Sequence, residues 1–127
     1  MNIENLAFKV NGNTYTIKFP TVGEYRAIET MKQTLSANNY SSMSRSMMVT
    51  ANEALDIIDL EAYLTVLCPK LIEDLKCDSF SQLGLLDYKE LRDAFKKQFL
   101  PWWNDIEKLL RPEPINQEKK DEEDKSN

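Results

Sequence analysis

The sequence predicts an α+β domain in which an N-terminal β-hairpin packs on four or five helices, followed by a disordered tail. Near the N-terminus, apolar residues alternate with polar ones on both sides of an Asn-Gly pair. From residue 22 onward they recur every three or four positions, as in amphipathic helices. This periodicity stops after Arg111, where a mixture of Pro, Lys, Glu and Asp begins. We therefore expect one domain over residues 1–110 and a charged, disordered tail over residues 111–127.

The hairpin is predicted from two alternating runs that flank the sequence Asn-Gly-Asn at residues 11–13. If the turn is Asn11-Gly12, Phe8 faces Tyr15; if it is one residue later, Val10 faces Tyr15. Both registers gather the same apolar side chains on one face: Leu6, Phe8, Val10, Tyr15, Ile17 and Phe19. Because an isolated two-stranded ribbon is only marginally stable in water, this face is expected to pack on helices.

The first helix is predicted to begin at about Val22 and to end near Ser36. Pro20 stops the second strand, and Thr21 and Glu24 have the spacing of a capping box. In that motif each side chain satisfies a backbone N–H group of the other residue. One face of the predicted helix is apolar and carries Tyr25, Ile28, Met31 and Leu35.

The middle of the chain predicts a second amphipathic helix from Ser42 toward Leu67, with Asp59 as a candidate break. Pro69 must end it, because the residue before a proline is disfavoured in helical geometry. Pro69 itself suits the first position of a further short helix. That short helix would carry Leu71, Ile72 and Leu75.

Capping signals also precede the last helical region. Residues 79–82 predict a turn that Gly84 closes, and residues 87–90 predict a helix start with Leu86 and Leu91 as a hydrophobic staple. Pro101 should then kink or break the helix, because it lacks an N–H and crowds the carbonyl of Lys97. Either two helices or one bent helix fits the apolar stripe of Leu91, Phe95, Phe99, Trp102, Ile106 and Leu109.

Composition excludes several functions. The net charge is −5 and the pI about 4.8, which disfavours nucleic-acid and anionic-membrane partners. No run of about 18 apolar residues is present, so we expect no membrane span and a cytoplasmic location. With no histidine, catalytic triads and histidine metal sites are excluded. We predict no enzyme activity and no cofactor.

Two clusters resemble sites but have simpler interpretations. Cys68 and Cys77 are expected to be buried free thiols in a reducing compartment. Glu53, Asp56 and Asp59 share one helical face but have no matching second acidic helix, so we interpret them as a solvated face and predict no metal site.

Two apolar clusters are candidates for partner binding. Met43, Met47 and Met48 would either line an adaptable groove for a partner helix or pack in the core. Trp102 continues the apolar stripe, and neighbouring helical residues point about 100° apart. Trp103 is therefore predicted to be the more exposed tryptophan and an anchor for a partner, unless another element covers it.

The order of these features resembles the small, acidic, helix-rich tail assembly chaperones of tailed bacteriophages. The matching features are the hairpin, the Phe19–Tyr25 junction, the helical middle, the Phe99–Trp103 segment and the charged tail. The resemblance implies binding of a long helical tape measure protein while tail-tube subunits assemble around it, in the cytoplasm of the host cell. It transfers no individual site residue.

These observations predict a non-catalytic protein-binding protein that shields a tape-measure-type helical client through its methionine and aromatic side chains. The alternative is a small structural or connector subunit that is retained in the phage particle. The oligomeric state stays open, with a homo-oligomer among the alternatives. A small enzyme that acts through Glu53, Asp56 and Asp59 is the least favoured interpretation.

Overall fold

A computed structural model of the chain describes residues 4–111, and it has the expected α+β class. The tail predicted over residues 111–127 lies, apart from Arg111, outside the described residues. The elements are β1 (Leu6–Val10), β2 (Asn13–Ile17), α1 (Val22–Leu35), α2 (Tyr40–Arg45), α3 (Val49–Leu67), α4 (Pro69–Leu75), the 3-10 helix η1 (Phe80–Gln82), α5 (Leu85–Ala94), the π-helix η2 (Phe95–Phe99) and α6 (Leu100–Leu110).

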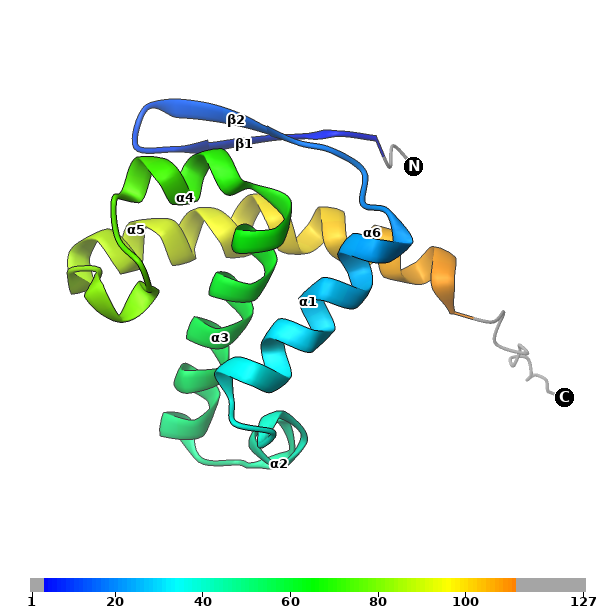
Figure 1. Cartoon of the computed structure of the whole chain (residues 1–127), viewed down its shortest axis with the longest axis vertical. Helices are drawn as coiled ribbons and strands as arrows, with labels where there is room; N and C mark the ends of the chain where they lie inside the picture. The colour runs from blue at the N-terminus through cyan, green and yellow to red at the C-terminus, as the bar shows by residue number, and fades with distance from the viewer. Residues whose placement is uncertain (1–3, 112–127) are drawn as a thin grey trace, which may run out of the picture.

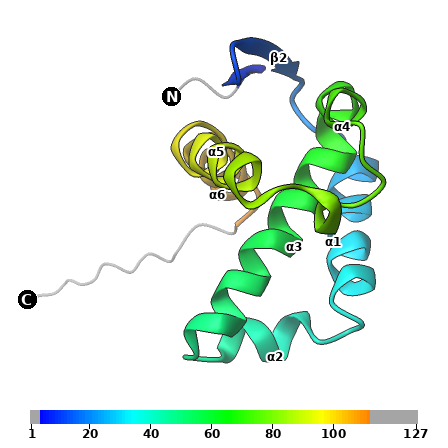
Figure 2. The same ribbon diagram turned by 90° about the vertical axis from the view of Figure 1, so that its left-hand side faces the viewer.

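The hairpin lies across one end of the molecule, over α4 and over the long rod that α5, η2 and α6 form together (Figure 1). From this end α1 and α3 run side by side to the opposite end, where α2 connects them (Figure 2). The rod packs against α1 and α3 on one side and against the hairpin on another. Two layers, the α1–α3 pair and the hairpin, therefore cover its side chains.

The hairpin has the register with an Asn11-Gly12 turn, in which Leu6 pairs with Ile17 and Phe8 with Tyr15. Both turn residues have positive φ values, 55° and 78°, as the tight turn between two strands requires. The apolar face packs on the helices, as predicted, with Phe8, Val10, Tyr15 and Ile17 buried. Phe19 is an exception because it lies beyond β2 and is 42% exposed.

The capping box at the start of α1 is confirmed. The Glu24 N–H donates to Thr21 Oγ1 at 3.1 Å, and the Thr21 N–H donates to Glu24 Oε1 at 2.9 Å. The helix begins at Val22 and is capped at its end by Ser36, also as predicted. The buried residues of α1 are Ile28 and Lys32. The apolar pattern of the sequence does not predict the burial of Lys32.

The prediction of one helix from Ser42 toward Leu67 is wrong at its start. The break lies at residues 46–48, between α2 and α3, and the chain is helical through Asp59. The Ser46 hydroxyl accepts a hydrogen bond from the Met48 N–H at 3.1 Å, a local bond that competes with the helical backbone pattern. Pro69 starts α4, as predicted.

The capping signals of the last helical region are confirmed only in part. Ser79 caps η1 by accepting from the Ser81 N–H. However, α5 begins at Leu85 and its N-cap is Gly84, three residues before Asp87, the N-cap that the capping signal predicts. Leu86 is 80% exposed, so the predicted hydrophobic staple is wrong.

Pro101 does not interrupt the rod. The residues around it keep helical φ and ψ angles, and the turn before it widens into η2, where the Leu100 N–H donates to the Phe95 carbonyl. This wider turn relieves the crowding that a proline imposes on the preceding helical turn. The apolar stripe therefore continues through Pro101 into α6 within a single rod (Figure 1).

Candidate protein-binding groove

Trp103 is not the exposed tryptophan that the sequence pattern predicts. It is 2% exposed and Trp102 is 7% exposed, so both are buried. Trp102 Nε1 donates to the Glu4 carbonyl at 2.6 Å, on the side of the N-terminal segment. Trp103 stacks on Tyr25 of α1, with ring centroids 5.8 Å apart, and meets the Tyr63 ring of α3 edge-on. Two layers cover the rod, so neighbouring side chains about 100° apart are both buried, and Trp103 cannot be a surface anchor.

The methionines lie at the far end of the α1–α3 pair. Met47 and Met48 belong to the α2–α3 connection and are 94% and 67% exposed, whereas Met43 is partly buried in α2. Core packing is therefore wrong for Met47 and Met48. They do not line the groove described next, and binding of a partner by these methionines stays a prediction.

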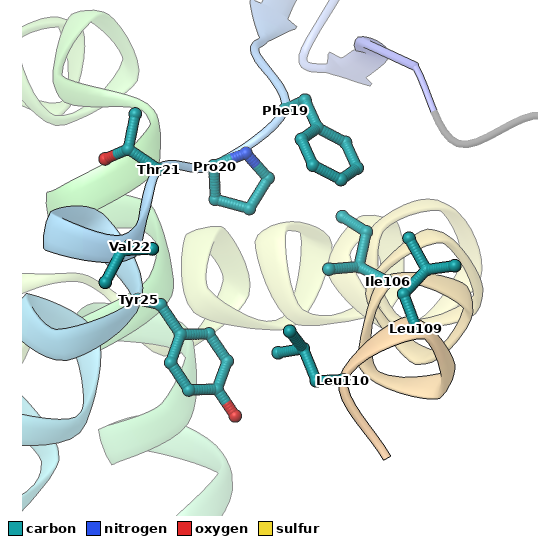
Figure 3. A pocket seen from close by; sticks show the side chains of 8 residues that line it. All are labelled: Phe19, Pro20, Thr21, Val22, Tyr25, Ile106, Leu109 and Leu110. Atoms are coloured by element: carbon teal, nitrogen blue, oxygen red, sulfur yellow. The ribbon is translucent and has the colours of Figure 1, made fainter. Parts of the chain in front are cut away.

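An apolar hollow of about 410 Å³ lies between the start of α1 and the end of α6 (Figure 3). We call it the α1–α6 groove. The residues that line it are Phe19, Pro20, Thr21, Val22, Tyr25, Ile106, Leu109 and Leu110.

Several large apolar side chains at the groove are open to solvent, while Ile106 is 3% exposed. Val22 is 81% exposed, Leu109 59% and Leu110 60%. Clusters of exposed apolar side chains on a soluble protein mark binding surfaces more often than isolated ones do. The groove therefore joins a buried base to an exposed apolar rim.

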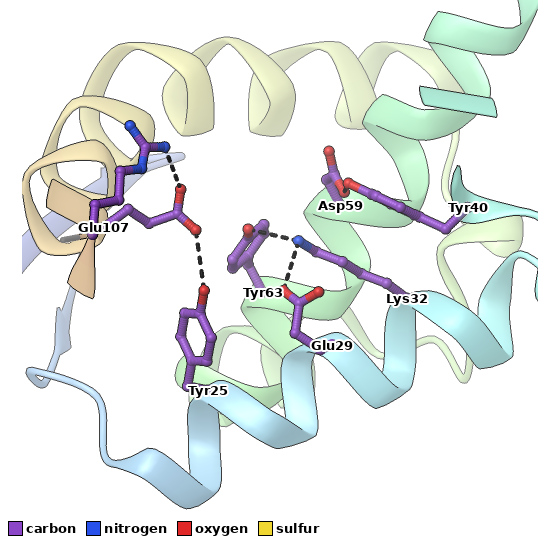
Figure 4. Close-up of polar contacts among 8 residues, drawn as sticks. Tyr25, Glu29, Lys32, Tyr40, Asp59, Tyr63 and Glu107 are labelled. Carbon is purple, nitrogen blue, oxygen red and sulfur yellow. Dashed lines mark hydrogen bonds and ion pairs between the residues drawn. The ribbon is translucent and has the colours of Figure 1, made fainter. Parts of the chain in front are cut away.

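The walls of the groove are held by contacts on both sides. At the start of α1, Pro20 and the capping box of Thr21 fix the entry of the chain into the helix. Tyr25 is held by its stacking on Trp103, and its hydroxyl donates to Glu107 Oε2 at 3.4 Å (Figure 4). Burial, and then the charge of Glu107, raise the pKa of Tyr25, so the hydroxyl stays protonated as a donor near neutral pH.

The polar groups at the groove are already used within the chain. Thr21 Oγ1 accepts the cap bond from the Glu24 N–H. Glu107 accepts from Tyr25 and lies 3.6 Å from Arg111 Nη2. These bonds leave few groups to orient a polar small molecule, so the surface suits an apolar segment.

A polar cluster farther along α1 fixes the helices behind the groove (Figure 4). Lys32 is 6% exposed, and its Nζ donates to the Tyr63 hydroxyl at 2.8 Å and to Glu29 at 3.1 Å. Tyr40 of α2 donates to Asp59 of α3 at 2.6 Å. The cluster thus joins α1, α2 and α3, and the Lys32 ammonium also lies 4.5 Å from the centre of the Tyr63 ring.

Burial and neighbouring charges act in opposite directions on the pKa values of this cluster. Burial alone would lower the pKa of Lys32, but Tyr40, Glu29 and Asp59 more than offset that effect and leave its pKa raised. Lys32 is therefore charged at neutral pH. Burial raises the pKa of the Asp59 carboxyl, although the hydrogen bond from Tyr40 and the charge of Lys32 oppose the shift.

Asp59→Asn is expected to gain stability relative to the wild type as the pH rises from about 3 to about 7. A carboxyl with a raised pKa in the folded state holds its proton more tightly when folded, so its contribution to stability is lost as the pH rises. The asparagine keeps an oxygen that can accept from Tyr40. Urea unfolding across this pH range measures the difference.

Asp93→Asn is the matched control for Asp59→Asn. The hydrogen bond from Lys89 lowers the pKa of Asp93, so the wild type should gain stability relative to this variant as the pH rises. If both variants show the same trend with pH, the description of Asp59 as a desolvated carboxyl is wrong.

The other candidate residues do not converge on a reactive centre. Asp56 lies 2.9 Å from Lys96 Nζ and Asp59 accepts from Tyr40, so each carboxylate has its own partner. Within residues 4–111 no group of three or more His, Cys, Asp or Glu side chains is placed to hold a metal ion. Cys68 and Cys77 are both free thiols. Burial raises the pKa of Cys68, so a smaller fraction of this residue is the reactive thiolate.

The comparisons with known proteins gave no relative. No protein-family model matches the chain, and neither the curated proteins nor the solved structures gave a match. In the part of the chain that the structure describes, no helix is long and apolar enough to cross a bilayer. The functional argument therefore depends on the residues and on the geometry of the groove.

Proposed function

We propose that this protein binds other proteins without catalysis, as a phage tail assembly chaperone that shields an apolar stripe of a tape-measure-type helical client. The observation that carries the proposal is the α1–α6 groove, with its exposed apolar rim and few free polar groups. The order of features in the sequence, which resembles that family, supplies the type of client.

An amphipathic helix is the occupant that this groove suits best. Such a helix presents apolar side chains at every third and fourth position and inserts them as anchors into a hydrophobic groove. Val22 on one wall and Leu109 and Leu110 on the other would contact the anchors from both sides. The net charge of −5 would keep the chaperone itself soluble while this rim is exposed.

Leu110→Gln is expected to weaken client binding by at least about 2 kcal/mol, the usual threshold for an interface hot spot. Stability should change by less than about 0.5 kcal/mol, because Leu110 is 60% exposed and glutamine is a good helix former. The measurement is the dissociation constant for an apolar segment of a long helical protein of the tape-measure type.

Leu86→Gln is the matched control, because Leu86 is also a helical leucine, is 80% exposed and lies outside the groove. It should leave client binding unchanged. Equal losses in the two variants, or none in either, would show that the α1–α6 groove is not the client site.

The alternative is a structural or connector subunit. A chaperone should be absent from purified mature phage particles or present only in traces, and mass spectrometry measures this directly. Stoichiometric amounts in the particle would favour the alternative. The chaperone proposal also expects the gene to lie between a tail-tube gene and a very long helical gene.

A further inference from the structure

The backbone of the hairpin has two edges, and the turn determines which groups point outward. In a hairpin with a two-residue turn, the flanking residues Val10 and Asn13 share hydrogen bonds, and the next pair, Lys9 and Thr14, does not. The backbone groups of Lys9 therefore point away from β2. The contacts of Gln98 agree: its amide accepts from the Lys9 N–H and donates to the Lys9 carbonyl, both at 2.7 Å.

The two edges differ in how they are covered. Gln98 of η2 covers the edge of β1 at Lys9 with these two hydrogen bonds. By the same alternation, the backbone groups of Thr14 and Thr16 point outward from β2. Within residues 4–111 these groups have no hydrogen-bond partner, and both threonines are exposed. We call the outward side of Asn13–Ile17 the β2 edge.

Space for another strand lies beside the β2 edge. A hollow of about 430 Å³ separates β2 from the junction of α3 and α4. Val66, Leu67 and Pro69 form apolar parts of its lining, on the side of the sheet that faces the helices. An added strand would therefore meet apolar side chains on one face and solvent on the other, like β2 itself.

The charges near the β2 edge are mainly basic, although the whole chain is acidic. Lys18 follows β2, Lys9 lies on the same exposed face of the hairpin, and Lys70 borders the hollow. The two strands themselves carry no carboxylate. Two acids lie nearby: Glu24 lines the hollow and accepts the cap bond from the Thr21 N–H, and Asp74 accepts from Tyr15, with its Oδ1 3.8 Å from Lys70 Nζ.

The lysines near the β2 edge favour one kind of binding partner over another. A second copy of the chain would add its own Lys18 and Lys70 to an edge that already carries these two charges, and such crowding of like charges is unfavourable. An acidic segment would have the opposite effect, because its carboxylates on the exposed face would lie beside Lys18. Apolar side chains at the alternate positions would face Val66 and its neighbours in the hollow.

We propose that the β2 edge binds an extended segment of a partner protein, with alternating acidic and apolar side chains, as the third strand of the sheet. The backbone groups of Thr14 and Thr16 supply the hydrogen bonds, and the lysines and the hollow supply the selectivity. This site is separate from the α1–α6 groove and does not depend on the proposed client.

The test uses the full chain and a synthetic peptide with blocked ends and the sequence Val-Glu-Val-Glu-Val-Glu-Val. The Glu peptide should bind at least about tenfold more tightly than the peptide with Lys in place of Glu, because its carboxylates complement Lys18. Binding should slow hydrogen exchange at the amides of Thr14 and Thr16. The proposal is wrong if hydrogen exchange slows only at the residues of the α1–α6 groove, or if the Lys peptide binds as tightly as the Glu peptide.

Thr16→Pro should reduce peptide binding at least about tenfold, because it removes an outward N–H but no hydrogen bond of the hairpin ladder. Thr16→Val keeps that N–H and should bind like the wild type. Unchanged peptide binding by Thr16→Pro would overturn the proposal. It would also be overturned if the wild type formed a dimer that Thr16→Pro dissociates, because a second copy would then occupy the β2 edge. Leu110→Gln should leave binding of this peptide unchanged, because Leu110 lies in the α1–α6 groove. A negative result at the β2 edge would therefore not contradict the groove proposal, and a negative result at the groove would not contradict this one.

Discussion

Trp103→Ala is expected to lower the free energy of unfolding by about 3 to 5 kcal/mol, the usual range for removing a large buried aromatic side chain. Trp103 is 2% exposed and contacts the rings of Tyr25, Tyr63 and Phe99, with the Tyr63 centroid 5.0 Å away. It therefore joins α1 and α3 to the rod. Urea denaturation followed by circular dichroism measures the loss.

Trp103→Phe is the control for this prediction. Within the described residues Trp103 Nε1 has no hydrogen-bond partner, so phenylalanine removes volume but no polar contact. Its cost should be clearly smaller than that of alanine. Trp102→Phe differs, because it leaves the Glu4 carbonyl without its donor. A loss below about 1 kcal/mol in Trp103→Ala would contradict the burial described for this residue.

Features encoded by neighbouring residues could be predicted from the sequence. The Asn11-Gly12 turn depends on two residues that tolerate positive φ, and the capping box depends on Thr21 and Glu24 three positions apart. Pro69 at the start of α4 belongs to the same class. In each case the bonds or dihedral angles that decide the structure lie within a few residues, so tertiary contacts did not overrule the pattern.

Features that depend on several elements could not be predicted in this way. The burial of Trp103 requires α1 and α3 to cover the side of the rod that the hairpin leaves open. Lys32 resembles an ordinary surface lysine in the sequence, yet Tyr63 and Glu29 provide partners for its ammonium. No periodicity along one helix contains this information.

The α1–α6 groove was missed for a related reason. The alternation of the hairpin places Phe19 on its apolar face, and helical periodicity places Leu109 on the apolar stripe of the last helix, so the pattern predicts that both lie in the core. In the structure Phe19 lies two residues beyond β2 and Leu109 lies in the last turn of α6, and both are partly exposed. The signal in the sequence was an excess of apolar residues at element ends, with Val22 at the start of α1 and Leu110 at the end of α6.

Ile17→Ala is expected to lower the free energy of unfolding by about 2 to 5 kcal/mol, since alanine leaves a cavity where an isoleucine was buried. Ile17 is 0% exposed and pairs with Leu6 in the face that packs on the helices. Phe19→Ala is the matched control, because Phe19 lies two residues farther along, is 42% exposed and should cost less despite its larger side chain. Chemical denaturation of both variants measures the difference. A loss below about 1 kcal/mol for Ile17→Ala would mean that the hairpin is an appendage and that its apolar face is not part of the core.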